Sequence, residues 1–243
     1  MFSQRELLQI FEIEGQILQF CGPIFFSNSS ELKPLNVCQN ATFGLVETSQ
    51  RKLLVTCYHV WEEFLKLRQN NSDAKIAVLL GGNYPVELKV SEPIGKDEEL
   101  DLATFDVGSI LLHCNKRSFY SLHSYPPPKI KNKDILAFIG YTGESRETSI
   151  AGAEFGYTAF GLSVSDVSGL RVVADLSKTN TIYDRQVKQQ SPYHGGISGS
   201  PCFQLLRNGC LRLVGFATSE ALGLIQMTHA ACLNTDGTIS NIN

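Results

Sequence analysis

The sequence predicts an all-β fold of the barrel or sandwich class. From about residue 40 onward, short segments rich in Val, Ile, Leu, Phe or Thr alternate with turns that contain Gly and Asn. One clear helical pattern, Trp61–Leu67, interrupts this series. A doubly wound α/β fold alternates strands with helices, so many short strands with a single helix argue against it.

Ten segments have this strand composition: Thr42–Glu47, Lys52–Thr56, Ile76–Leu80, Val86–Val90, Leu102–Val107, Ile135–Ile139, Tyr157–Leu162, Gly169–Val173, Pro201–Leu205 and Leu211–Phe216. The segment Ser124–Lys133, with three consecutive prolines and three lysines, divides them into two groups. We therefore expect a first β-rich unit over 36–124 and a second over 125–243. Residues 1–35 form a lead-in segment, in which Leu7, Ile10 and Phe11 fit one helical face.

The composition excludes several classes of protein. The chain has 243 residues, 43% hydrophobic and 19% charged, which is enough apolar material for a globular core. Lys and Arg number 21 against 24 acidic residues, which gives a net charge of −3. A chain with this charge lacks the excess of basic residues that is typical of a nucleic-acid-binding protein. No apolar run approaches the roughly 18 residues of a spanning helix. The start MFSQRELLQ lacks the pattern of a secretory signal, so we expect a cytoplasmic protein without membrane contact.

The seven cysteines favour free thiols. Their number is odd, and no signal for secretion accompanies them. No Cys-x-x-Cys or paired Cys/His spacing indicates zinc, so we expect no metal.

Three short segments carry residues suited to catalysis. In VTCYHV, His59 follows an apolar strand at a strand-to-helix corner, where an imidazole can act as a general base. In DLATFDV, Asp101 opens an apolar strand, and a carboxylate there can orient an imidazole. Asp106 is the second candidate for that role.

The third segment is HGGISGSPC. Glycines on both sides of Ser198 allow a tight turn that exposes the hydroxyl and gathers backbone N–H groups, which could bind an oxyanion. The chain order is His59, Asp101, Ser198. The nucleophile elbow of α/β-hydrolases is excluded, because Ser200 stands at its second glycine and the acid and histidine should follow the serine.

VTCYHV, DLATFDV and GISGSP resemble the signature blocks of the chymotrypsin-like (trypsin-like) serine peptidases, and the similarity spans roughly residues 40–235. The family implies two six-stranded antiparallel β-barrels after the lead-in segment, with the active site between them. By this resemblance His59 and Asp101 come from the first barrel and Ser198 from the second. Gly196 and Ser198 would supply the oxyanion N–H groups.

The resemblance also implies where substrate binds. The strand at Ala217, Thr218 and Ser219 would pair with an extended peptide. Other expected pocket residues are Pro192, Tyr193 and His194, with His229 as a further candidate. Pro192 stands where an acid would select Arg or Lys, so that selector is absent.

A second departure concerns activation. Secreted relatives pair a new amino terminus with an acid just before the serine, whereas this chain has Ile197 there. Activation by such trimming is therefore not expected, and the resemblance is to an intracellular, bacterial-type member.

We therefore expect a serine endopeptidase that cleaves peptide or protein substrates through an acyl-enzyme, without metal or organic cofactor. The alternative is a protease-like scaffold that binds peptides without cutting them. In a third reading, a regulatory protein partner that engages residues 1–35 switches the activity on.

Overall fold

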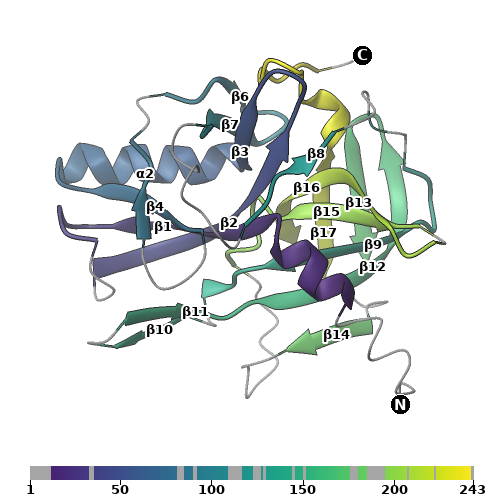
Figure 1. Ribbon diagram of the computed structural model, residues 1–243, viewed down its shortest axis with the longest axis horizontal. Helices are drawn as coiled ribbons and strands as arrows, with labels where there is room; N and C mark the ends of the chain where they lie inside the picture. The colour runs from purple at the N-terminus through teal and green to yellow at the C-terminus, as the bar shows by residue number, and fades with distance from the viewer. Residues whose placement is uncertain are drawn as a thin grey trace.

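The computed structural model describes residues 12–32, 36–80, 85–89, 92–108, 117–122, 127, 130–143, 146–149, 152–175, 180–184, 195–206, 208–221 and 223–241. Figure 1 shows two β-rich parts, with most of the first half of the chain on the left and most of the second half on the right.

The first part is an eight-stranded sheet. Its order is β5 (Pro85–Glu87), β4 (Lys75–Leu79), β1 (Cys21–Ser27), β2 (Val37–Glu47), β3 (Lys52–Thr56), β7 (Leu102–Asp106) and β6 (Gly95–Asp97). These neighbours pair antiparallel, whereas β8 (Tyr120–Ser121) pairs parallel with β2. The expected first barrel had six strands, so this sheet is larger than the resemblance implied.

The second part is a closed barrel. Its order is β13 (Arg171–Asp175), β17 (Leu224–His229), β16 (Leu211–Ala221), β15 (Pro201–Leu205), β9 (Ile135–Gly140) and β12 (Thr158–Ser168). The pairing of β12 with β13 closes the ring of six strands, as expected for this half. Beside it, β14 (Asn180–Asp184) extends the sheet from β12, and β10 (Arg146–Ser149) with β11 (Gly152–Phe155) forms a separate hairpin.

The helix α2 (Tyr58–Asn70) covers one side of the first sheet and confirms the helical pattern at Trp61–Leu67. Its buried residues Val60, Trp61 and Phe64 point into the apolar cluster of that sheet. The ring centroids of Trp61 and Phe105 lie 5.3 Å apart, which fixes α2 against β7. This packing determines where the first turn of α2 lies, and His59 belongs to that turn.

The described part of the lead-in segment belongs to the main fold. Residues 12–18 are helical, and Glu14 in this helix accepts a hydrogen bond from Tyr157 of the second half. The following strand β1 lies between β2 and β4. The first sheet thus includes a strand from residues 1–35, and Leu7, Ile10 and Phe11 lie outside the described residues.

A segment near the C-terminus returns to the first sheet. The hydroxyl of Thr104 donates to the carbonyl oxygen of Gly237 at 2.5 Å and accepts the N–H of Gly95 at 2.9 Å. A Cβ on Gly95 would lie 2.6 Å from the Gly237 oxygen, so only glycine permits this approach. Among the described helices, none is both long and apolar enough to span a membrane.

We predict that Trp61→Ala lowers the free energy of unfolding by about 3–5 kcal/mol, because it leaves a cavity under α2. Trp61→Phe keeps a ring in that space and should cost clearly less. Urea unfolding followed by far-UV circular dichroism measures both variants, since neither retains the tryptophan. Equal stability of the two variants would contradict the packing described here.

Candidate active site

His59 and Asp101 form a two-point contact. The backbone N–H of His59 donates to Oδ1 of Asp101 at 2.9 Å, and the His59 ring Nδ1 lies 2.8 Å from Oδ2. Because a carboxylate only accepts, Nδ1 must carry the hydrogen, which leaves Nε2 as an acceptor. The same carboxylate thus fixes both the position of the helix start and the tautomer of the imidazole.

Asp101 occupies a turn immediately before β7, with a φ of 52°. Asp tolerates this left-handed conformation better than most residues. Asp106, the second candidate, lies at the other end of β7 and forms an ion pair with Arg51 at 2.6 Å. The structure therefore excludes Asp106 as the partner of His59.

The environment of His59 changes its pKa in two directions. Burial lowers the pKa, but the hydrogen bond and the charge of Asp101 raise it, together with the charges of Glu63 and Glu62. The net effect is a pKa above the ordinary value. The imidazolium is therefore stabilised where a general base would need to hold a proton.

The loop that carries Ser198 is fixed by Thr42 of β2. The backbone N–H of Thr42 donates to the Ser198 carbonyl oxygen at 3.0 Å, and its hydroxyl donates to the Gly196 carbonyl oxygen at 2.8 Å. That hydroxyl also accepts the N–H of Tyr141 at 2.9 Å. A single side chain of the first half thereby holds two segments of the second half.

Two glycines allow this loop to approach so closely. Gly196 has a φ of 104° and Gly199 a φ of 89°, a conformation that favours glycine. A Cβ on Gly196 would lie 2.5 Å from the Tyr141 carbonyl oxygen, and one on Gly199 would overlap the Thr42 carbonyl oxygen. The glycines around Ser198 are therefore required by packing as well as by the turn.

His59 and Ser198 line one open cavity of about 430 Å³. Its walls come from β1, β2, α2, β10 and two loops, and the other lining residues are Phe26, Cys38, Gln39, Asn40, Ala41, Val60, Glu63, Gly143, Arg146, Gly195 and Gly196. The Ser198 hydroxyl donates to the Thr218 carbonyl oxygen at 3.4 Å. The structure thus brings the expected serine and histidine to the same cavity, with Asp101 behind the histidine.

Cys57 lies behind this pair and is fully buried. Its thiol donates to the Ala217 carbonyl oxygen at 3.4 Å, which links the start of α2 to β16. Burial, and then the charge of Asp101, raise the pKa of Cys57 well above its ordinary value. Within the described part of the chain, the ligand atoms of Cys57, His59 and Asp101 lie within 4.8 Å of one another and could hold a metal ion. A metal would have to displace the thiol proton, which this environment holds firmly.

The remaining expected residues have different outcomes. Ala217, Thr218 and Ser219 lie on β16, whereas Pro192, Tyr193 and His194 lie outside the described residues. His229 is buried and its Nδ1 accepts the N–H of Ala231, where it caps the 3-10 helix η5 (Ala230–Cys232). The six described cysteines are free thiols, as the odd count predicted, and Cys114 lies outside the described residues.

Sequence reasoning missed several residues near the site, notably Thr42, Asn40 and Arg146. Each comes from a segment remote in sequence from Ser198, and their polar side chains carry no local motif. Only the pairing of the two halves shows that they meet there.

Comparison with known proteins defines the fold. No family model and no curated protein matches this sequence. Among solved structures 340 chains are similar, so the architecture is widely shared and does not by itself identify a function. One of them, in the crystal structure of Deg5, matches with a TM-score of 0.52 at 12% identity, over 92% of this chain and 90% of that one. The chain therefore has the chymotrypsin-like double-barrel fold, with a closed six-stranded barrel and another sheet.

We predict that His59 titrates above its ordinary value of about 6.5 in the intact protein. Asp101→Asn should lower this pKa, because it removes the charge that opposes burial most strongly and leaves only the smaller effects of Glu63 and Glu62. Asp106→Asn is the matched control and should leave the titration in place. Nuclear magnetic resonance of the imidazole carbons measures all three proteins. An unchanged pKa in Asp101→Asn would show that the carboxylate does not stabilise the imidazolium.

Proposed function

We propose that this chain is a serine endopeptidase with Ser198 as nucleophile, His59 as general base and acid, and Asp101 as the orienting carboxylate. The observation that carries the proposal is the two-point His59–Asp101 contact beside a cavity that also contains Ser198. The chymotrypsin-like double-barrel fold also supports the proposal.

The proposed reaction follows from the tautomer of His59. With Nδ1–H held by Asp101, Nε2 can take the proton of the Ser198 hydroxyl as the oxygen attacks the scissile carbonyl. The same imidazolium then gives its proton to the leaving amine. Water repeats these steps on the acyl-enzyme, and Ser198 is regenerated.

The geometry of the loop supports Gly196 and Ser198 as oxyanion donors. The Gly195 carbonyl oxygen accepts the N–H of Gly143 at 2.8 Å. In a planar trans peptide the N–H points opposite to the carbonyl, so the Gly196 N–H is directed away from Gly143. Among the described residues, neither this N–H nor that of Ser198 donates to a backbone carbonyl. Both remain available for a developing oxyanion.

β16 is the proposed platform for the acyl side of the substrate. Within the described residues, the pairing of β16 with β15 ends at Phe216, so Thr218 and Ser219 lie beyond the part of β16 that pairs with β15. An extended peptide could add to the sheet there through backbone hydrogen bonds. Position 192 is a proline and not an acidic residue, which suits a pocket without selectivity for Arg or Lys.

The second candidate function is a peptide-binding protein whose hydrolytic activity is latent. The Ser198 hydroxyl favours the latent peptide-binding protein, because it donates its hydrogen bond to the Thr218 carbonyl oxygen and not to His59. Catalytic hydrogen bonds often tighten only with substrate, so the same geometry also suits an active enzyme. Labelling of Ser198 distinguishes the two.

We predict that a fluorophosphonate probe labels the wild-type protein and that Ser198→Ala abolishes both labelling and peptide cleavage. Loss of the nucleophile should reduce the cleavage rate by about 10⁴ to 10⁶. Ser72→Ala, at an exposed serine, is the control and should label normally. Circular dichroism checks that the variants are folded. Cleavage by Ser198→Ala at the wild-type rate would refute the proposal, and folded wild type that neither labels nor cleaves would favour the latent scaffold.

We also predict that the loop depends on Thr42 and not on a newly cut amino terminus. Ile197 is apolar and buried against Gly140, so its side chain cannot pair with an ammonium group. Thr42→Val removes both hydroxyl bonds and should reduce labelling by about 10², whereas Thr42→Ser keeps them. Labelling rates of the two purified variants, each with an intact N-terminus, give the comparison. Labelling that requires prior cleavage of the N-terminus would contradict this account.

A further inference from the structure

We propose that Arg146 forms an anion-binding subsite on the leaving-group side of Ser198, and that the enzyme prefers an Asp or Glu in the peptide segment after the scissile bond. This inference rests on the proposed function and names the class of substrate for it.

The position of the cavity assigns it to the leaving segment. His59 must protonate the leaving amine, so the chain after the scissile bond has to run past the imidazole. The 430 Å³ cavity contains His59 and the first turn of α2, whereas no residue of Ala217–Ser219 lines it. The acyl segment on β16 and the leaving segment in this cavity would therefore lie on opposite sides of Ser198.

Arg146 brings a positive charge to this cavity. Its Nη1 donates to Oδ1 of Asn40 at 3.1 Å, and its Nη2 lies 3.5 Å from the Cys38 carbonyl oxygen. The Asn40 amide is itself fixed, because its Nδ2 donates to the Tyr141 carbonyl oxygen at 2.8 Å. These bonds use two of the five guanidinium donors, so the group can still bind a carboxylate.

The β10–β11 hairpin holds Arg146 in place. Arg146 is the cross-strand partner of Phe155 on β11, and the ring of Phe155 lies 5.2 Å from that of Phe25 on β1. Figure 1 shows this hairpin next to the first sheet, although its residues belong to the second half of the chain. The arginine is thus preorganised over the cavity, which reduces the entropy lost when a ligand binds.

Charges of both signs face the cavity. Glu63 on α2 is acidic and Arg146 on β10 is basic, and His59 and the thiol of Cys38 are the other titratable groups that line it. An acidic substrate residue gains most from Arg146, because a guanidinium and a carboxylate form paired, charge-assisted hydrogen bonds. An acidic substrate residue that contacts Glu63 instead would be disfavoured. The preference is therefore positional, for the residue that contacts Arg146.

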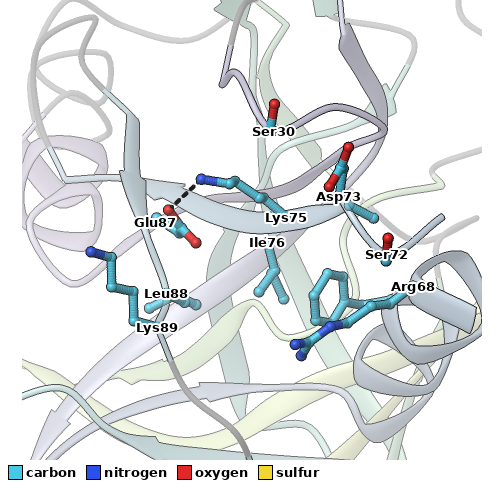
Figure 2. A pocket seen from close by; sticks show the side chains of 11 residues that line it. Ser30, Arg68, Ser72, Asp73, Lys75, Ile76, Glu87, Leu88 and Lys89 are labelled. Atoms are coloured by element: carbon cyan, nitrogen blue, oxygen red, sulfur yellow. Dashed lines mark hydrogen bonds and ion pairs between the residues drawn. The ribbon is translucent and has the colours of Figure 1, made fainter.

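A second cavity, of about 440 Å³, provides a matched control. Figure 2 shows Arg68, Lys75 and Lys89 among its lining side chains, with Lys75 bonded to Glu87 at 2.8 Å. This cavity contains neither His59 nor Ser198. Arg68→Glu therefore makes the same change of charge as Arg146→Glu, at an arginine that lies at the other end of α2 from His59 and lines a different cavity.

The experiment compares wild type, Arg146→Glu and Arg68→Glu on a peptide library from a digested proteome, with the new N-termini sequenced. Synthetic peptide pairs that differ only by Glu or Lys after the cleaved bond then give a ratio of kcat/KM within each variant. We expect wild type and Arg68→Glu to prefer Glu by about tenfold, and Arg146→Glu to prefer Lys. The ratio is unaffected by changes in total activity.

An unchanged Glu/Lys ratio in Arg146→Glu would overturn the subsite, as would a wild-type protein that labels and cleaves without acidic preference. Wild type that neither labels nor cleaves would instead overturn the proposed function, and with it this inference. A shift of the ratio in Arg68→Glu equal to that in Arg146→Glu would show a general effect of net charge and would also overturn the subsite.

Discussion

The hydrogen bonds of Thr42 connect the two halves of the chain at the proposed nucleophile. Its N–H and hydroxyl bind the carbonyl oxygens of Ser198 and Gly196, and its own carbonyl oxygen accepts the hydroxyl of Thr56 at 2.8 Å. Thr56 ends β3, two residues before the turn that contains His59. The serine loop and the histidine are therefore both positioned from one residue of β2. Because Thr42 and Thr56 are buried, loss of a partner would leave a buried polar atom unpaired.

The sequence predicted the strands that depend on local composition. The segments Lys52–Thr56 and Pro201–Leu205 were placed with their observed bounds, because continuous apolar residues with polar or turn neighbours define such strands. β1 was missed, since a Gly-Pro pair interrupts its apolar run. Pro23 is tolerated because the β1–β4 register begins at Ile24, so its missing N–H falls outside that ladder. β6, with the sequence GKD, has no apolar pattern at all and exists through its pairing with β7.

The pairing of His59 with Asp101 agrees with the sequence expectation, which came from motif resemblance and chain order. Spacing alone does not distinguish Asp101 from Asp106, and the turn at Asp101 decides the matter by directing its carboxylate to the start of α2. The cavity could not be derived in this way. Arg146 meets Asn40 across a separation of 106 residues, and neither residue type signals such a contact. Sequence patterns report periodicity and local turns, whereas a cavity wall assembled from β1, β2, α2, β10 and two loops depends on tertiary pairing.

The contact between Thr104 and Gly237 can form only late in the synthesis of the protein. These residues are 133 positions apart, and Thr104 lies on β7 just after Asp101. The ribosome releases the first half of the chain well before residue 237 exists, and contacts so distant in sequence form late. β7 has its neighbours β3 and β6 early, but the Thr104 hydroxyl lacks this acceptor until residue 237 has been made. The proposed nucleophile, Ser198, is likewise made after the whole first sheet, so the proposed proteolytic site stays unassembled while the nascent first half is exposed to cleavage.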